Sequence, residues 1–202
     1  MITDTIYNRI KNDVLHRLET ELDKRLVYHA ADHTLDVMQA AETLCKHEQL
    51  NTRDRFLTGL AALLHDAGYL ETYDDHETAS ANMARAILPG YGLDDEEIDM
   101  ICSAIMATAM PQKAGTVIAK IVADADLDYL GRDDLFMVSQ RLHYEWKLFG
   151  KVYSLRAWHE LQLEFLETHS YFTSSAHRLR DKGKEKNISE LRELLFKSSG
   201  KS

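Results

Sequence analysis

Apolar residues recur at the period of an α-helix along almost the whole chain. In the first 22 residues they fall at every fourth position, at Ile6, Ile10, Val14, Leu18 and Leu22. Only 2 prolines and 9 glycines interrupt the 202 residues, so long helices form easily. No stretch shows convincing strand-like alternation. The pattern therefore predicts an all-α protein.

Capping and turn residues divide this pattern into separate helices. We expect helices over about 6–22, 32–47, 52–67, 76–88, 95–109, 116–130 and 133–149, with an eighth beginning after Ser154. Gly68 is expected to end the third helix. Residues 174–187 are polar and charged, which favours a loop or weak helix, and a capping box at Asn187 opens a short last helix. We therefore expect one domain over 1–173 and a helical extension over 174–202.

Charge and cysteine content narrow the classes of partner and compartment. The net charge is −9 and no basic cluster is present, which argues against binding to duplex nucleic acid. A small phosphorylated substrate stays compatible, because a bound metal reverses the local field. Cys45 and Cys102 are far apart and outside any CxxC motif, so we expect buried free thiols. The polar N-terminus and the lack of long apolar runs predict no signal peptide, no membrane span and a cytoplasmic protein.

The sequence places several metal-binding residue types at helix ends and on apolar faces. His65 and Asp66 follow the apolar run 60–64, which takes this helix end into the core, where a lone carboxylate is costly unless it is paired or binds a cation. His33 lies on the apolar stripe of the helix over 32–47. Two imidazoles and carboxylates together suit a divalent metal such as Mn, Fe, Co or Zn.

A further carboxylate ligand is expected from the apolar segment 122–128. This segment contains Asp124, Asp126 and Asp128. A helical wheel mildly disfavours Asp124, which lies about 120° from the apolar centre, and it does not separate the other two at about 80°. His76 continues the packed face of a later helix at its N-terminal end, so it points toward the interior or a cleft.

The ordered set His33, His65-Asp66 and Asp126 resembles the HD superfamily of metal-dependent phosphohydrolases. The resemblance covers about residues 25–135. Local matches are Tyr28-His29-x-x-x-His33, Leu63-Leu64-His65-Asp66-Ala67-Gly68, His76-Glu77-x-x-Ser80 and Ala125-Asp126-Leu127. The first and last of these are similar to the cyclic-nucleotide phosphodiesterase branch. The match around Ala125-Asp126-Leu127 favours Asp126 over its neighbours as the last ligand.

The resemblance implies an HD-domain-like helical bundle with a metal site and a hydrolytic activity. His33, His65, Asp66 and Asp126 would bind a divalent metal, which is Mn, Fe, Co, Mg or Zn. The implied reaction is hydrolysis of a phosphate ester, often a nucleotide, by a metal-activated water. In that reaction Asp66 would also orient the water and His29 would protonate the leaving oxygen. His76 and Glu77 would bind substrate or orient the water.

Two departures from the family pattern bear on this expectation. Many members carry Lys or Arg after the His-Asp-x-Gly segment, where this chain has Tyr69. The phosphate must then meet a cation from elsewhere in the chain, and the candidates are Arg85, Lys113, Lys120 and Arg132. The paired histidines of two-metal members are missing, which predicts one tight metal site and at most one weak one.

Two other functions and one assembly are compatible with the same sequence. A chain with this fold could be a non-catalytic module that binds a nucleotide or regulates a partner. A minor alternative is a di-iron oxygenase of the same fold, against which the missing histidine pair argues. The last helix carries Leu191, Leu194 and Leu195 on one side, which makes a homodimer a candidate assembly.

Overall fold

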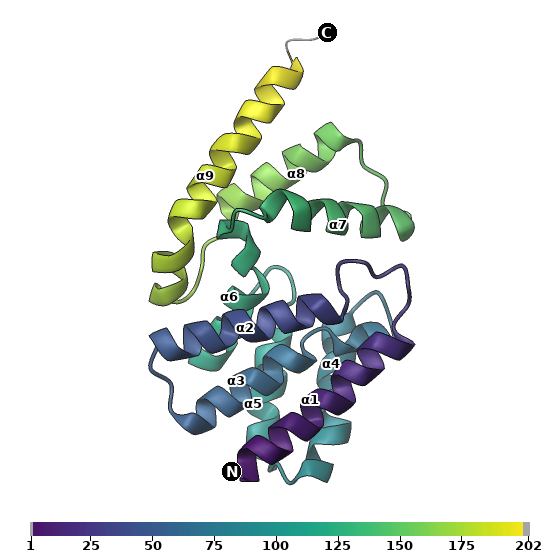
Figure 1. The fold of residues 1–202 in the computed structure, drawn as a ribbon, viewed down its shortest axis with the longest axis vertical. Helices are drawn as coiled ribbons and strands as arrows, with labels where there is room; N and C mark the ends of the chain where they lie inside the picture. Colours follow the sequence, from purple (N-terminus) through teal and green to yellow (C-terminus); the bar gives the residue numbers. More distant parts are fainter. Residues whose placement is uncertain (1, 200–202) are drawn as a thin grey trace.

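The computed structural model describes residues 2–199, and all its regular elements are helices (Figure 1). This confirms the predicted all-α class. The α-helices are α1 (Ile2–Glu21), α2 (Ala31–His47), α3 (Thr52–Leu64), α4 (His76–Ile87), α5 (Asp95–Met106), α6 (Val117–Asp126), α7 (Leu135–Leu148), α8 (Leu155–Thr168) and α9 (Ser174–Ser199). Three short 3-10 helices join them: η1 (Ala67–Leu70), η2 (Leu88–Tyr91) and η3 (Asp128–Gly131).

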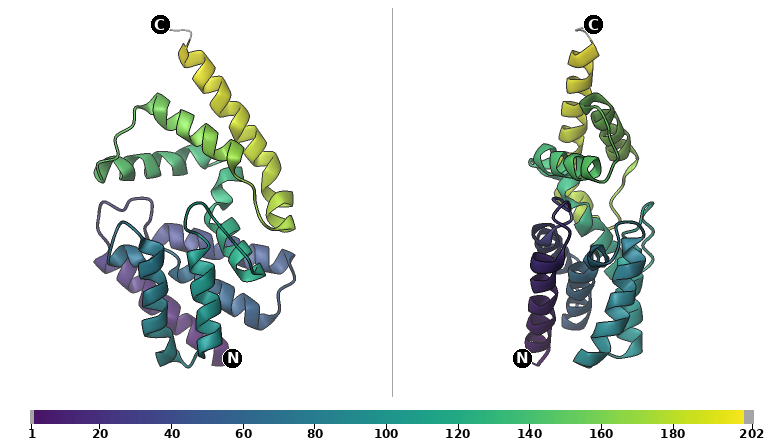
Figure 2. Two further views of the ribbon diagram at one scale, coloured as in Figure 1. Left: turned by 180° about the vertical axis from the view of Figure 1, so that it is seen from behind. Right: turned by 90° about the vertical axis from the view of Figure 1, so that its right-hand side faces the viewer.

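Helices α1 to α6 form a six-helix body around α3. Helix α3 contacts α1, α2, α5 and α6, and Figure 2 shows α1 on one side of the body and α4 and α5 on the other. Eight of the 13 residues of α3 are buried, from Phe56 to Leu64. A helix that is apolar on nearly all sides belongs at the centre of a bundle. The end of α3, which carries the His-Asp pair, therefore lies deep in the protein.

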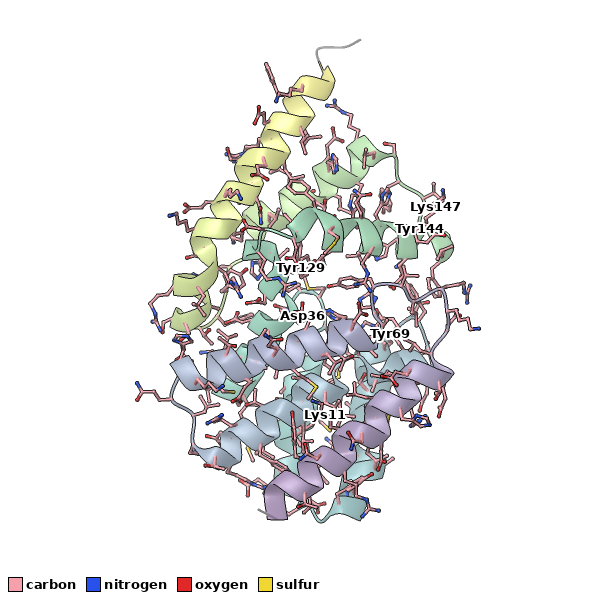
Figure 3. The ribbon with its side chains drawn as sticks, viewed as in Figure 1. Lys11, Asp36, Tyr69, Tyr129, Tyr144 and Lys147 are labelled. Carbon is pink, nitrogen blue, oxygen red and sulfur yellow. The ribbon has the colours of Figure 1, made fainter. Side chains whose placement is uncertain are left out.

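Helices α7, α8 and α9 form a second part next to the body. Figure 1 shows α7 and α8 above α2, diverging from each other toward the connection that joins them, with α9 along one edge. A second, smaller hydrophobic cluster holds this part to η3, and it contains Tyr28, Leu127, Tyr129, Leu130, Leu135, Leu166 and Leu191. Tyr129 lies at the junction between the two parts (Figure 3).

Helix α9 decides between the loop and the weak helix predicted for residues 174–187. The segment is helical, and a single helix runs through Ser174–Ser199, so the separate short helix predicted to begin at Asn187 is wrong. The buried side-chain amide of Asn187 instead donates to the carbonyl oxygens of Leu130 and Arg132, each at 2.9 Å. Arg180 of the same segment pairs with Asp128 of η3 at 2.6 Å. No local pattern reveals these two contacts. The division at residue 173 stays a prediction.

Helix α9 crosses η3 at two glycines. A Cβ atom at Gly183 would lie 2.0 Å from the carbonyl oxygen of Gly131, which is far inside van der Waals contact. Any side chain at this crossing would push the two backbones apart. These glycines therefore set how closely the last helix packs.

Three helices end earlier than predicted. Helix α3 ends at Leu64 and not near Gly68, α5 ends at Met106 and not near residue 109, and α6 ends at Asp126 and not near residue 130. Gly68 lies inside η1, where a Cβ would be 2.0 Å from the carbonyl oxygen of His76. Its N–H donates to Ser80 Oγ at 2.7 Å. This glycine is required by close packing of η1 on α4, and not by a left-handed helix cap.

Cys45 and Cys102 are both free and buried, as predicted. Within the described part of the chain, every helix is too short or too polar to cross a membrane.

Candidate metal centre

The four predicted metal ligands converge in the structure. Asp66 Oδ2 lies 3.2 Å from His65 Nε2 and 3.5 Å from His33 Nε2. Asp126 Oδ1 lies 3.3 Å from His33 Nε2 and 3.7 Å from His65 Nε2. Ligand atoms bound at 2.0–2.2 Å to one tetrahedral or octahedral ion are separated from their neighbours by about 3.0–3.5 Å. The observed separations therefore fit a shared divalent cation.

Each ligand is positioned by the first or last turn of a helix. His33 comes from the first turn of α2, and Asp126 is the last residue of α6. His65 caps α3 with helical backbone angles, whereas Asp66 leaves the helix at φ −107° and ψ 5°. Adjacent residues of a regular helix point about 100° apart. The break after His65 explains how two neighbours reach the same point.

The donor atoms of three ligands are buried and have no partner in the protein. These atoms are His33 Nε2, His65 Nε2 and Asp66 Oδ2, and the three residues form a cluster with metal-ligand geometry. His65 Nδ1 lies 2.8 Å from the carbonyl oxygen of Ala62, to which it donates. That bond holds the proton on Nδ1 and leaves the Nε2 lone pair directed at the cluster. Buried polar atoms without partners are costly, so the cluster is built to receive a cation.

The charges around Asp66 also favour a bound cation. Burial favours the neutral acid, but the positive charges of His65 and His29 and the close imidazole of His76 hold the pKa of Asp66 well below its usual range. Burial also lowers the pKa of His65, and Asp66 and Asp126 outweigh it and raise that pKa to about 9. Each shift expresses a need for positive charge beside the carboxylates. A divalent cation would meet that need with neutral imidazoles.

The structure separates the three aspartates that the helical wheel left open. Asp124 accepts hydrogen bonds from the backbone N–H of Thr173 at 2.8 Å and from its hydroxyl at 2.6 Å. Asp128 pairs with Arg180 at 2.6 Å. Asp126 alone of the three faces the two histidines. Asp124 thus holds the segment that precedes α9, and Asp128 holds α9 itself.

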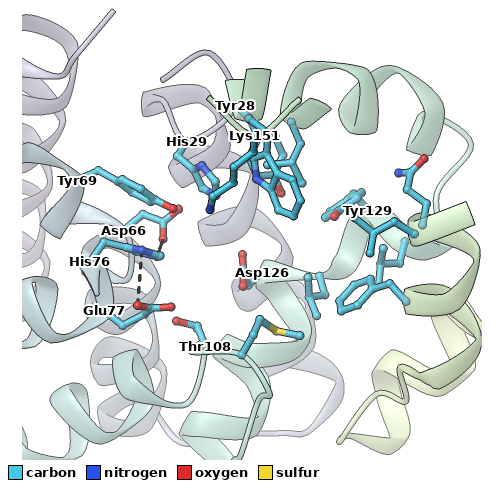
Figure 4. Close-up of a pocket in the computed structure, with 18 of the residues that line it drawn as sticks. Tyr28, His29, Asp66, Tyr69, His76, Glu77, Thr108, Asp126, Tyr129 and Lys151 are labelled. Carbon is cyan, nitrogen blue, oxygen red and sulfur yellow. Dashed lines mark ion pairs between the residues drawn. The ribbon is translucent and has the colours of Figure 1, made fainter. Parts of the chain in front are cut away.

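Two further predicted residues, His76 and Glu77, stand beside the cluster. His76 Nε2 lies 3.4 Å from Asp66 Oδ1, and His76 Nδ1 lies 3.5 Å from Glu77 Oε2 (Figure 4). Tyr69 stacks on His76 with ring centroids 3.9 Å apart and on His29 at 4.5 Å. The residue that replaces the family's Lys or Arg therefore fixes the spacing of two histidine rings.

His29 is held by a carboxylate that the sequence analysis missed. Its Nδ1 pairs with Glu145 Oε1, and Glu145 Oε2 accepts the backbone N–H groups of Tyr28 and His29 at 2.8 and 3.1 Å. Burial lowers the pKa of His29, but the hydrogen bond to Glu145 and the nearby carboxylate charges outweigh it and raise the pKa. His29 is thus oriented and biased toward its protonated form.

A sequence signal for Glu145 existed. Leu135, Val138 and Leu142 form an apolar stripe at helical spacing, and Glu145 occupies the next position of that stripe. The side chain of Glu145 is 0% exposed. A carboxylate on an apolar stripe predicts a buried polar partner, although it does not say which partner.

A cavity of about 590 Å³ opens beside the cluster, between the six-helix body and helices α7 and α8 (Figure 4). His29, Asp66, Asp126, His76 and Glu77 line one end. The other end is mainly apolar and includes both tryptophans, Trp146 and Trp158, so these residues form cavity wall as well as core.

Lys151 is the one lysine or arginine among the described residues that line the cavity. It belongs to the α7–α8 connection, and its Nζ lies 5.1 Å from the ring centroid of Tyr73 and 5.2 Å from that of Trp146. None of the four cations considered from the sequence, Arg85, Lys113, Lys120 and Arg132, lines this cavity. The structure therefore identifies a basic residue that the sequence analysis did not consider.

Comparison with known proteins identifies the family. The HD domain model matches residues 30–128, a segment that begins just before His33 and ends just after Asp126. The chain belongs to the HD-domain superfamily. All four converging residues lie inside the matched segment, so the family assignment and the geometry identify the same part of the molecule.

One relative shares part of this sequence. An uncharacterized protein of Clostridium beijerinckii is 30% identical over 89 residues, which span 43% of this chain and 56% of that protein. The match thus covers little more than half of that relative's length.

Two solved structures are similar over nearly the whole chain. A predicted HD superfamily hydrolase from an uncultured Thermotogales bacterium has a TM-score of 0.59 at 22% identity and covers 94% of this chain and 91% of its own. Bacillus subtilis YpgQ, crystallised with ADP, has a TM-score of 0.69 at 18% identity and covers 96% and 95%. At these identities the likeness shows the fold alone. This HD chain therefore has a hydrolase-like fold with a His/His/Asp cluster suited to a metal.

Proposed function

We propose that this HD protein is a metal-dependent phosphohydrolase that acts on a small phosphate ester. The observation that carries the proposal is the set of unpartnered, buried donor atoms of His33, His65 and Asp66. Of these residues Asp66 lines a cavity that also contains His29 and Asp126. A metal site beside a cavity with a candidate proton donor is the arrangement that this reaction requires.

In this proposal the ligands are His33, His65, Asp66 and Asp126. A divalent cation bound by them would lower the pKa of a water ligand and polarise a phosphoryl oxygen. Mixed nitrogen and oxygen ligands suit Mn, Fe, Co or Zn, and Mg is a further candidate. The single cluster found among the described residues supports one tight site.

The remaining residues of this end supply orientation and protons. His29 donates a proton to the leaving oxygen, and Glu145 holds the imidazole in the required orientation. Asp66 Oδ1 faces His76, which in turn faces Glu77. This chain of side chains is placed to orient the attacking water or the substrate.

Lys151 is the proposed phosphate partner from the protein. It forms no ion pair among the described residues, and Figure 4 shows its side chain extending from the α7–α8 connection toward the cavity. Ammonium groups bind phosphate as point charges. Lys151 thus takes the part that the resemblance assigns to a Lys or Arg in the place of Tyr69.

Nucleotides are the first substrate class to test, because YpgQ, whose fold this chain shares, was crystallised with ADP. The chelator-treated protein is assayed with nucleotides, other phosphomonoesters and phosphodiesters, while Mn, Mg, Co, Fe(II) or Zn is added back singly. We expect turnover that depends on the added metal. The ester that is cleaved fastest identifies the substrate class.

The matched variant for this assay is Asp66→Ala, which removes a ligand of the cluster. We expect it to lose both metal binding, measured by titration calorimetry, and turnover. Full activity of Asp66→Ala would contradict the proposal. Metal binding by the wild-type protein without turnover of any ester would instead favour a non-catalytic binding module.

A further inference from the structure

The end of the cavity away from the metal ligands is almost entirely apolar. Helices α7 and α8 supply its wall, which includes Leu142, Trp146, Trp158, Leu161, Phe165 and Leu166. Among these residues Trp158 and Leu166 are fully buried in the protein, at 2% and 1% exposure. The wall is therefore a fixed surface at its deep side.

Few polar groups line this end. The indole N–H of Trp158 donates to Ser139 Oγ at 2.9 Å. The rings of Tyr28 and Tyr129 meet edge to face, with centroids 6.1 Å apart. Their two hydroxyl groups and the amide of Gln162 are the polar groups that these lining side chains offer. A ligand here thus meets mainly apolar surface.

The apolar lining restricts which alcohol can form the ester with the phosphate of a substrate. A sugar or polyol carries several hydroxyl groups, and most would lose their water here without gaining a partner. An apolar group loses nothing on entering and gains from leaving water. The opposite end supplies the metal ligands, and Lys151 at the α7–α8 connection supplies positive charge. The cavity therefore has one phosphate end and one apolar end.

We propose that the substrate is a phosphate monoester of an apolar alcohol, whose alkyl chain or aromatic ring occupies the α7–α8 end of the cavity. The inference rests on the proposed phosphohydrolase function and adds the chemical class of the leaving group. The volume of about 590 Å³ falls in the range of small-molecule sites. Water adds to phosphorus and the alcohol leaves with the proton from His29, so the products are the free alcohol and inorganic phosphate.

The test compares esters whose leaving alcohols have similar acidity, so that only the apolar body differs. Butyl, octyl and 2-phenylethyl phosphate are compared with glycerol 3-phosphate on the metal-loaded protein. We expect kcat/KM for octyl phosphate to exceed that for glycerol 3-phosphate by about 100-fold, since each buried methylene adds to binding. Octyl and 2-phenylethyl phosphate distinguish a chain from a ring as the natural group.

Variants on the two faces of α8 locate the effect. Leu161→Gln places an amide on the cavity wall, and Glu164→Gln makes a similar side chain on the exposed face of the same helix. We expect Leu161→Gln to lower kcat/KM for octyl phosphate about 10-fold while the value for glycerol 3-phosphate changes less than about 2-fold. Glu164→Gln is expected to change neither.

A binding measurement separates failure of this inference from failure of the proposed function. Octyl phosphonate cannot be hydrolysed at its P–C bond, and its binding to the Mn-loaded protein is measured by calorimetry. Tight binding of octyl phosphonate without turnover of any ester would overturn the proposed function and retain the apolar-group inference. Turnover with equal kcat/KM for octyl and glycerol esters would overturn the inference alone. So would faster cleavage of AMP than of octyl phosphate, by about 10-fold or more in kcat/KM.

Discussion

The two ends of the cavity are built in different ways. The metal-ligand end comes from helix termini inside the six-helix body, where α3 buries eight of its 13 residues. The apolar end comes from α7 and α8, where three of 14 and two of 14 residues are buried. Segments with few buried contacts open more easily than a dense core. The comparison indicates that the geometry of the His/Asp cluster is fixed by the core, whereas the apolar wall is fixed only at its deep side, at Trp158 and Leu166.

Glu145 connects these two regions. It is one of the three buried residues of α7, and it binds His29 and its neighbour's backbone in the six-helix body. His29, the proposed proton donor, is therefore oriented only when α7 packs on the body. The carboxylate of Glu145 therefore connects the helix α7, which forms part of the apolar wall, to the end of the cavity that holds His29.

The largest expected effect is on metal affinity, and it should distinguish substitution of Asp126 from substitution of Asp124, two residues earlier. Asp126→Ala removes a proposed metal ligand. Removing a residue that only hydrogen-bonds to a ligand typically lowers metal affinity about 10- to 100-fold, and we expect a larger loss here. Asp124→Ala leaves buried donors of residues 172 and 173 without an acceptor, which costs about 3 kcal/mol of stability. Calorimetric metal titration and urea unfolding measure the two effects. The reverse pattern of losses would refute the roles of both aspartates.

The second prediction loosens α9 without touching the ligand cluster. Gly183→Ala places a methyl group against the backbone of Gly131, so we expect a loss of about 3 kcal/mol in unfolding free energy. Gly115→Ala is the control, because nothing lies within 4 Å of its Cβ position. Metal affinity should be unchanged in both variants at temperatures where they stay folded. A large loss of affinity in Gly183→Ala would show that the two regions are not independent.

The third prediction breaks the connection between the regions. Glu145→Gln keeps the size of the side chain but removes the charge that helps to raise the pKa of His29. We expect kcat to fall about 10- to 100-fold. His29 acts in its protonated form, so the decline of kcat at high pH should begin at a lower pH in the variant. A lower kcat with an unchanged pH profile would point to a purely structural role.

The smallest expected effect concerns Lys151, the proposed phosphate partner from the α7–α8 connection. Lys151→Met keeps an unbranched side chain beside Tyr73 and Trp146 but removes the charge. We expect KM for a phosphate ester to rise about 10-fold, because an exposed charge contributes modestly to binding, with kcat little changed. Arg85→Met is the control, since Arg85 pairs with Asp99 and does not line the cavity. Equal effects of the two variants would remove Lys151 from the site.

The sequence alone determined the all-α class and indicated three of the four residues that converge. Helical periodicity is a local property, because it depends on residues three and four positions apart. His33, His65 and Asp66 were identifiable because each is a polar residue on or next to an apolar stripe, where burial requires a partner. Asp126 was favoured over its neighbours only through its resemblance to a family motif. The catalytic roles of these residues remain predictions.

The tertiary structure decided what depends on partners distant in sequence. Asp124 and Asp128 do not face the two histidines as Asp126 does. Asp124 accepts a hydrogen bond from Thr173, and Asp128 pairs with Arg180. The helix over 174–199 continues through Asn187, where the sequence predicts a capping box, because η3 satisfies the Asn187 side chain. Glu145 and Lys151 reach the site only when α7 and its following loop pack on the body. A local pattern reveals that a buried polar group needs a partner, whereas only the packed chain determines which partner it meets.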